Sequence, residues 1–277
     1  MRPVIYYRNY DMSAAEKVAA IEVFGESCVF DSRMKASAGD LVIARYSALP
    51  FYKELSEDLA SKGAVLINTL HQHNFIADLT RWYSVLFELT PKTWYKLDSL
   101  PEKGGPYILK GVTNSKKQLW HTHMFAIDKT AAIRVHSRLC EDGLIGDQQI
   151  IIRQYVPLVT YGHGIGGVPI TKEFRFFVVC GKIMCGGFYW SSNIDQVPEV
   201  PLVSEVPLNF LKKVVYRIGN SANFYSLDVA QTASGDWIVI EINDGQMSGL
   251  SENQPLEFYR ALKANINENI VESVLIE

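Results

Sequence analysis

Two carboxylates near the C-terminal end of the sequence are spaced so that a β-hairpin would bring them together. Asp228 and Glu241 belong to two stretches in which polar and aliphatic residues alternate, as they do in strands with one buried face. The stretches are joined by residues 233–236, Ala-Ser-Gly-Asp, a sequence typical of a tight turn. If Ala233 faces Asp236 across this turn, Asp228 lies directly opposite Glu241.

The same register separates the side chains by chemical type. Pairs on one face are aliphatic and pairs on the other are polar, which supports the register because a shift by one residue would mix them. The predicted pairs are Leu227 with Ile242, Val229 with Ile240, Asp228 with Glu241, and Ser226 with Asn243.

A carboxylate pair of this kind predicts a bound cation. Two carboxylates about 5 Å apart across a sheet repel each other unless positive charge lies between them. With Asn243 two residues further along the strand, Asp228 and Glu241 offer hard oxygen ligands that suit Mg²⁺ or Mn²⁺. The alternative is an exposed polar face of an antiparallel sheet, which needs no metal.

Three lysines and an arginine could meet an anionic ligand. Lys110 ends an apolar strand and is followed by a small polar loop that contains Lys116 and Lys117. Such a loop can offer backbone N–H groups, hydroxyls and ammonium groups to phosphate oxygens, or it can be a solvated turn. Arg175 alternates with apolar residues in the stretch 173–179, so it is predicted on the polar face, where it would be half-exposed or would bind a phosphate.

The elements that must position these residues alternate between strand and helix at the start of the chain. Strands are predicted at 4–7, 40–45 and 64–68, and helices at 14–24, 49–62 and 74–89. This βαβαβ pattern predicts a parallel sheet covered by helices.

The remainder of the chain is predicted to be richer in strands. Strands are predicted at 107–111, 119–127 and 150–156, with a helix at 129–139. A glycine-rich loop at 161–167 then leads to a hairpin of strands at 173–179 and 183–190. A proline-rich loop at 195–207 and a helix at 208–218 follow, and a last helix is predicted at 255–274 after the second hairpin.

Composition limits the class of protein. The 277 residues are 48% hydrophobic and 21% charged, which predicts a folded chain with a core. The net charge of −3 leaves no basic excess for duplex DNA. The sequence shows no export signal and no apolar run long enough to span a membrane, and its four cysteines lack the spacing of a disulfide scaffold. We therefore expect a cytoplasmic protein that does not bind membranes. A homo-oligomer is compatible with the sequence.

The ordered set of these motifs resembles the ATP-grasp ligases. The resemblance implies an α/β (α+β) ATP-grasp fold in which two lobes clasp a nucleotide after a βαβ pre-ATP-grasp domain. The implied domains are 1–88 for the leading domain, 89–156 for the central lobe and 157–277 for the C-terminal lobe with its metal-binding hairpin. The segments that carry the resemblance are Lys110 and its loop, Arg153-Gln154-Tyr155-Val156, Glu173-Phe174-Arg175, Asp228 and Glu241-Ile242-Asn243.

The resemblance also implies roles for individual residues. Lys110 would contact the α- or β-phosphate, and the Lys116 and Lys117 loop would fold over the β- and γ-phosphates. Backbone groups of Gln154, Tyr155 and Val156 would contact the adenine edge, and Glu173 the ribose. Arg175 would contact the γ-phosphate or acyl phosphate, which makes Arg175 and Lys110 the implied catalytic residues. Asp228, Glu241 and Asn243 would hold Mg²⁺ or Mn²⁺.

Three departures from the family pattern indicate a divergent branch, similar to the arginine-and-lysine variant ATP-grasp proteins of phages and bacteria. The phosphate loop reads Thr-Asn-Ser-Lys-Lys at 113–117 instead of being glycine-rich, and Gln154 replaces a common glutamate. Residues 78–81, Asp-Leu-Thr-Arg, stand where many relatives have Asp-Lys. Both Arg81 and Lys92 are candidates for the role of the missing early lysine.

The function implied is an ATP-dependent carboxylate–amine ligase that forms amide or peptide bonds through an acyl phosphate. Its substrates would be a small-molecule or peptide carboxylate and an amine. One alternative is a nucleotide-binding regulatory or interaction protein of the same fold without turnover. Another is a metal-binding protein that uses the histidine pairs His71/His73 and His121/His123, although no further ligand has suitable spacing. The loop at 161–167 is interpreted as a lid or an ordinary inter-strand loop.

Overall fold

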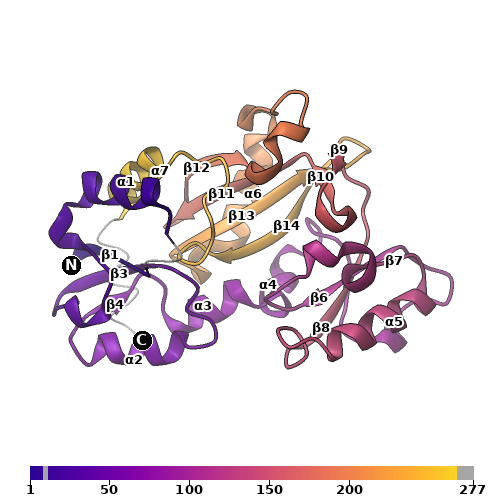
Figure 1. Ribbon diagram of the computed structural model, residues 1–277, viewed down its shortest axis with the longest axis horizontal. Helices are drawn as coiled ribbons and strands as arrows, with labels where there is room; N and C mark the ends of the chain where they lie inside the picture. The colour runs from indigo at the N-terminus through magenta and orange to yellow at the C-terminus, as the bar shows by residue number, and fades with distance from the viewer. Residues whose placement is uncertain (9–11, 267–277) are drawn as a thin grey trace.

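The computed structural model describes residues 1–8 and 12–266 (Figure 1). These residues form three four-stranded sheets and one two-stranded sheet. Figure 1 shows the N-terminal sheet at the left, the C-terminal sheet across the middle and the central sheet at the lower right. No described helix is both long and apolar enough to cross a bilayer. The domain boundaries after residues 88 and 156 stay predictions.

The N-terminal sheet is parallel, as predicted, with the strand order β2-β1-β3-β4. Its strands are β1 (Arg2–Tyr7), β2 (Val29–Phe30), β3 (Asp40–Arg45) and β4 (Val65–Leu66). Helix α1 (Ala14–Phe24) packs on one face together with the C-terminal helix α7 (Pro255–Asn265), and α2 (Tyr52–Ala60) packs on the other. The predicted bounds of α1 and β3 are confirmed. Residues 267–274 of the predicted last helix lie outside the described residues.

Two short helices replace the single helix predicted at 74–89. They are α3 (Leu70–Ala77) and α4 (Leu79–Leu86), which meet at Asp78. Asp78 has an extended backbone and accepts hydrogen bonds from the Thr80 N–H at 2.8 Å and the Thr80 hydroxyl at 2.7 Å. The aspartate is therefore the N-cap of a new helix, which a continuous apolar pattern does not reveal.

The central sheet is antiparallel and has the order β5-β8-β6-β7. Its strands are β5 (Thr93–Trp94), β6 (Tyr107–Gly111), β7 (Phe125–Ala126) and β8 (Ile150–Gln154), and α5 (Lys129–Cys140) covers one face. The strand predicted at 119–127 is wrong, because only Phe125 and Ala126 pair with β6. Residues Trp120–Met124 form a π-helical turn instead, packed beneath the glycine-rich loop.

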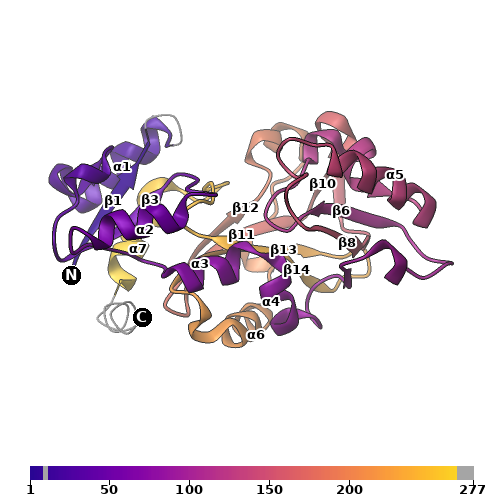
Figure 2. The same ribbon diagram turned by 90° about the horizontal axis from the view of Figure 1, so that it is seen from below.

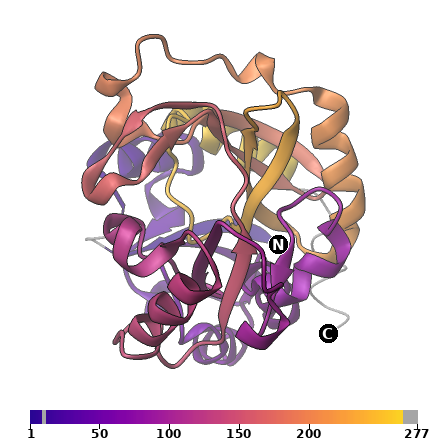
Figure 3. The ribbon, with the colours of Figure 1, turned by 90° about the vertical axis from the view of Figure 1, so that its right-hand side faces the viewer.

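The C-terminal sheet is also antiparallel and has the order β12-β11-β13-β14. Its strands are β11 (Glu173–Val179), β12 (Lys182–Phe188), β13 (Phe224–Gln231) and β14 (Trp237–Asp244). Helices α3, α4 and α6 (Leu208–Ile218) lie along one face, as Figure 2 shows from below. The other face is turned toward the central sheet, which lies beneath it in Figure 3. The small sheet pairs β9 (Thr160–His163) with β10 (Pro169–Thr171).

The hairpin of β13 and β14 has the predicted register away from its turn and a different register near it. Three predicted pairs are confirmed: Asp228 with Glu241, Leu227 with Ile242, and Ser226 with Asn243. Val229 pairs with Val239 instead of Ile240, because a β-bulge shifts the register by one residue. Side chains beyond the bulge therefore exchange faces, so Val239 enters the core while Ile238 and Ile240 line the pocket described below.

Candidate active site

A pocket with about 850 Å³ of empty space lies between the central and C-terminal sheets. Its walls combine apolar side chains with charged groups from both sheets, a combination typical of sites for ligands that have an apolar and an ionic part. The apolar residues include Ile108, Trp120, Met124, Ile238 and Ile240, and the charged residues are Lys110, Lys117, Arg153, Glu173 and Glu241.

Arg175 supplies the positive charge beside Asp228. The two residues are cross-strand neighbours on β11 and β13, and the guanidinium binds both carboxylate oxygens, with Nε–Oδ1 at 2.8 Å and Nη2–Oδ2 at 2.7 Å. Nη1 also donates to the Gly249 carbonyl at 3.0 Å. Burial alone would lower the pKa of Arg175, but Asp228 outweighs burial and raises it, so the arginine stays charged. Arg175 lies on the face of β11 opposite Phe174 and Phe176, as predicted, but it is buried rather than half-exposed because it pairs with Asp228.

An ion pair between Lys110 and Glu241 joins the central sheet to the C-terminal sheet. Lys110 extends from β6 and its Nζ donates to Glu241 Oε1 on β14. Burial alone would raise the pKa of Glu241, but Lys110 and Lys117 outweigh it and lower the pKa to about 2. Burial lowers the pKa of Lys110, which Glu241 partly offsets. The pocket therefore contains an ionised carboxylate whose counter-charge comes from the opposite sheet.

The two lysines of the polar loop have different surroundings. Lys117 lines the pocket and donates from Nζ to the Tyr189 hydroxyl at 2.7 Å. Lys116 forms an ion pair with Asp142 at 2.8 Å, away from the described lining of the pocket. The structure thus brings Lys117, but not Lys116, together with Lys110 and Glu241.

The segment after β8 passes along the pocket as predicted, but part of its backbone is already hydrogen-bonded. Gln154, Tyr155 and Val156 all line the pocket. The Gln154 N–H donates to the Lys92 carbonyl at 2.8 Å, and the Tyr155 N–H donates to the Pro106 carbonyl at 2.9 Å. Of these three residues, only Val156 has an N–H that no described acceptor receives, so it is the donor open to a ligand.

Arg153 is a pocket residue to which the sequence pattern assigns no role, although it begins one of the segments that carry the resemblance. Its Nη1 donates to the Ile240 carbonyl at 2.7 Å and its Nη2 to the Thr90 hydroxyl, whereas the buried Nε has no partner among the described residues. Burial lowers its pKa to about 10. The sequence feature that could have indicated Arg153 is its place near the end of an otherwise apolar strand. Neither Arg81, which pairs with Asp78, nor Lys92, which lies against Trp94, is part of the described lining.

Glu173 is a buried carboxyl group with one unused oxygen. The residue is 3% exposed, and its Oε2 accepts from the Thr171 hydroxyl at 3.2 Å. No described group donates to Oε1, although the residue lines the pocket. Burial raises the pKa of Glu173 to about 7, despite the opposing effect of Lys117. A buried acceptor of this kind indicates a ligand that brings a hydrogen-bond donor.

The sequence matches the family described as "ATP-grasp domain, R2K clade family 3" over residues 99–262, which is more than half of the chain. The chain belongs to the ATP-grasp family. The match includes the pocket residues from Lys110 to Glu241. A search of curated protein sequences found no significant match.

Solved structures of ATP-grasp proteins resemble nearly the whole chain. The RimK domain ATP-grasp protein from Sphaerobacter thermophilus is 15% identical, with a TM-score of 0.63 over 95% of this chain and 99% of its own. D-cycloserine synthetase DcsG is 12% identical, with a TM-score of 0.60 over 95% and 99%. The ATP-grasp ligase PsnB, complexed with a minimal precursor, Mg and ADP, is 12% identical, with a TM-score of 0.55 over 95% and 98%. The predicted ATP-grasp fold is confirmed.

The donors on the C-terminal hairpin of this ATP-grasp chain fit Mg²⁺ in kind. Asp228, Glu241 and Asn243 present oxygen atoms on one face of the sheet. Within the described part of the chain no group of three His, Cys, Asp or Glu side chains could hold a metal ion. The hairpin would therefore supply two carboxylates and one amide, which suits Mg²⁺ because water and phosphate oxygens usually complete its shell.

The glycine-rich loop between β9 and β10 packs against the segment that follows the phosphate-loop lysines. Gly166 and Gly167 have φ angles of +71° and +82°. A Cβ atom would lie 1.9 Å from the Gln118 carbonyl oxygen at Gly166 and 2.1 Å from the His121 ring at Gly167. Only glycine permits this approach, and Val168 directly after it lines the pocket. The loop thus packs against the segment that contains Lys117, and its interpretation as a lid stays a prediction.

The histidine pairs do not form a metal site. His71 and His73 lie on α3 rather than on a strand, where two residues of separation point side chains in different directions. His71 is exposed and His73 is buried against Asp244. His121 and His123 lie in the π-helical turn, and the His123 Nδ1 is 2.8 Å from the Thr122 hydroxyl.

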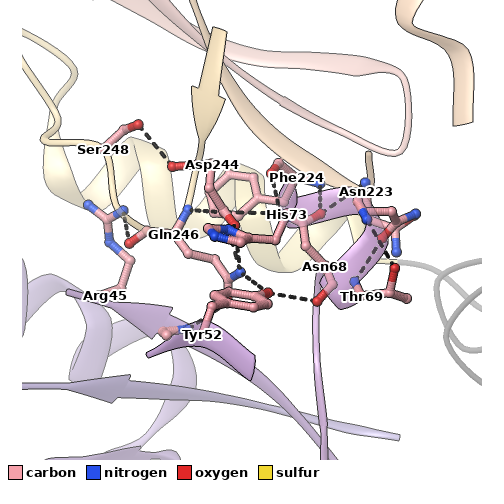
Figure 4. A network of polar contacts seen from close by, with 12 residues as sticks. Arg45, Tyr52, Asn68, Thr69, His73, Asn223, Phe224, Asp244, Gln246 and Ser248 are labelled. Carbon is pink, nitrogen blue, oxygen red and sulfur yellow. Dashed lines mark hydrogen bonds and ion pairs between the residues drawn. The ribbon is translucent and has the colours of Figure 1, made fainter. Parts of the chain in front are cut away.

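His73 belongs to a buried network that holds the end of β14 against the N-terminal sheet (Figure 4). Its Nδ1 lies 2.9 Å from Asp244 Oδ2, and its ring stacks on Tyr52 with centroids 3.8 Å apart. Asn68 donates to Asp244 Oδ1 at 3.0 Å and accepts the Phe224 N–H at 2.9 Å. Because Asp244 directly follows Asn243, these contacts fix the position of the Asn243 amide on the face that carries Asp228 and Glu241.

The next residues continue the same connection. Gln246 accepts the Ala44 N–H at 3.0 Å and donates to the Tyr52 hydroxyl at 2.9 Å. Arg45 donates to the Gly245 carbonyl at 2.6 Å and forms a buried ion pair with Glu16 at 2.8 Å. The loop after the hairpin is therefore hydrogen-bonded to the end of β3.

Replacing His73 by alanine is expected to lower the free energy of unfolding by about 2–4 kcal/mol, because Asp244 and the Tyr52 ring lose a partner where water cannot replace it. Urea unfolding followed by circular dichroism measures the change. The exposed neighbour provides the control, since His71→Ala should change stability by less than about 0.5 kcal/mol. Equal stability of both variants would contradict the role given to His73.

Replacing Glu173 by glutamine should change how stability depends on pH. The pKa of Glu173 is about 7 in the folded chain and near 4.5 when exposed, so its stabilising contribution is present below pH 4.5 and lost as the pH rises to about 7. Relative to wild type, Glu173→Gln should gain up to about 3 kcal/mol between pH 4.5 and pH 8. Unfolding curves at several pH values measure this gain, with exposed Glu199→Gln as the control. A difference that does not vary with pH would refute the assignment.

Proposed function

We propose that this ATP-grasp protein is an ATP-dependent ligase that joins a substrate carboxylate to an amine through an acyl phosphate. The observation that carries the proposal is the meeting of Lys110 and Glu241 across the two sheets, in a pocket that also holds Lys117. Membership of the ATP-grasp family supports ATP as the ligand. The two lobes would then close on the nucleotide.

The proposed reaction has two steps. A substrate carboxylate oxygen attacks the γ-phosphorus while the bond to the β-phosphate oxygen breaks, which gives ADP and an acyl phosphate. The amine then attacks the acyl carbon, the amide C–N bond forms, and inorganic phosphate and a proton leave. Phosphoryl transfer mainly needs positioning and neutralisation of charge, which Lys110, Lys117 and Arg175 would provide.

Other residues would bind the nucleotide. The Val156 N–H and nearby carbonyl groups would contact the adenine edge, together with Gln154 and Tyr155. Glu173 would accept a hydrogen bond from a ribose hydroxyl, a role supported by its unused buried oxygen. Lys116 would join the phosphate loop only by leaving Asp142, so its proposed role requires the loop to move.

Asp228, Glu241 and Asn243 would hold Mg²⁺ or Mn²⁺, which would neutralise the phosphates. Glu241 remains ionised, with its pKa near 2, and is therefore able to serve as a ligand. Both carboxylates already contact protein cations, so a metal would compete with Arg175 for Asp228 and with Lys110 for Glu241. Arg175 and Lys110 would then be displaced toward the phosphates.

The substrates are proposed by class. The fold neighbours include a synthetase named for D-cycloserine and a ligase complexed with a minimal precursor. We accordingly propose a small-molecule or peptide carboxylate and an amine as partners.

A nucleotide-binding protein without turnover is the second candidate. It is favoured by the two ion pairs, because Lys110 and Arg175 already neutralise the carboxylates that a metal would need. The loop at 113–117, which lacks glycine, points in the same direction. Such a protein would bind ATP but would not release phosphate when substrates are added.

Purified protein with Mg²⁺ and ATP should release phosphate only when both a carboxylate and an amine are supplied, tested with panels of amino acids and peptides. Glu241→Gln should lower this turnover by at least about 100-fold, since it removes the carboxylate charge that would hold the metal ion during phosphoryl transfer. The exposed Glu199→Gln variant is the control for a general loss of charge. Normal turnover in Glu241→Gln would sink the metal assignment, and ATP binding without any substrate-dependent phosphate release would favour the second candidate.

A further inference from the structure

Tyr189 contacts the two cations that come from different lobes. Lys117 Nζ, from the loop of the central sheet, lies 4.3 Å from the centroid of the Tyr189 ring and 2.7 Å from its hydroxyl. Arg175 Cζ, from the C-terminal sheet, lies 4.8 Å from the same centroid. One aromatic side chain thus interacts with both positive groups that would meet the terminal phosphates.

The backbone around Tyr189 holds the ring firmly. Tyr189 directly follows β12, and its N–H donates to the Glu173 carbonyl at 2.9 Å. Its neighbour Trp190 packs edge-on at 5.2 Å and is anchored by a hydrogen bond from Nε1 to the Thr171 hydroxyl at 3.2 Å. Lys117 also lies 5.4 Å from the Trp190 ring, so two aromatic rings surround its ammonium group.

Lys117 has no ion-pair partner among the described residues, unlike Lys110, so its charge is available to a ligand. Lys110 is paired with Glu241, and the Oε2 of Glu173 is bonded to Thr171. Burial alone would lower the pKa of Lys117, but Tyr189, Glu173 and Glu241 outweigh burial and raise it. Neither carboxylate is an ion-pair partner of Lys117 within the described chain. Its partners are the Tyr189 hydroxyl and two aromatic faces, which attract a cation and leave it available to an anionic ligand.

We propose that Tyr189 is a positioning residue that presents Lys117 to the terminal phosphates of ATP and separates it from Arg175. The inference rests on the proposed function and adds to it a residue that would touch the two cations rather than the nucleotide. The aromatic face reduces the repulsion between the two positive groups, and the hydroxyl fixes the ammonium at one edge of the ring.

Calorimetric titration with Mg-ATP and with AMP tests the proposal. Tyr189→Phe, which keeps the ring and removes the hydroxyl, should raise the Kd for ATP about 3- to 10-fold. Tyr189→Leu removes the ring as well and should raise it about 10- to 100-fold. AMP lacks the terminal phosphates, so its Kd should change less than about 2-fold in both variants. Tyr216→Phe, at a position that is 86% exposed, is the matched control.

The variants also separate a positioning role from a structural one. A merely structural role would weaken ATP and AMP binding equally, and this outcome would overturn the proposal. An ATP-to-AMP affinity ratio in Tyr189→Leu equal to that of wild type would also overturn it, while leaving the ligase proposal standing. Selective loss of ATP affinity in a protein that shows no turnover would support the role of Tyr189 and count against the ligase.

Discussion

The burial of opposite charges between two sheets is the constraint on which the pocket depends. A carboxylate removed from water is costly unless a cation accompanies it. Asp228 is accompanied by Arg175 within the C-terminal sheet, whereas Glu241 is accompanied by Lys110 from the central sheet. The distance between the two sheets therefore depends on the ion pair of Lys110 with Glu241, and so on the charge of Glu241. An anionic ligand that attracted Lys110 would alter this link directly.

Features set by neighbouring residues in the sequence were predicted better than features that depend on contacts between distant residues. The opposition of Asp228 and Glu241 followed from alternation and one turn, and α1, β3 and β6 follow similar local signals. The bulge near Ile240 is not predictable in this way, because residues 237–240 are all apolar and alternation does not distinguish the two faces there. The pairing of Lys116 with Asp142 and the break at Asp78 depend on polar contacts that alternation does not register.

The pocket residues missed from sequence share one property. Arg153 lines the pocket and donates to the Ile240 carbonyl of the other sheet, and Tyr189, which lies next to the pocket residue Trp190, accepts a hydrogen bond from Lys117 of the central sheet. The sequence shows His73 only as half of a histidine pair, because its partner Asp244 lies 171 positions away in the chain. Residue type and spacing identify groups that are able to bind a ligand or take part in a reaction, but the tertiary structure decides which of them meet.

The connection between the N-terminal sheet and the last strands has a consequence for the order in which the chain acquires its structure. The core beneath β1 and β3 includes Phe258 and Leu262 of α7, and the end of β3 is capped by Gln246. During synthesis, the first sheet emerges from the ribosome long before these partners exist. The face of this sheet that packs on α7 stays incompletely covered until nearly the whole described chain has been made. Of the described lobes, the one translated first is therefore among the last to be completed.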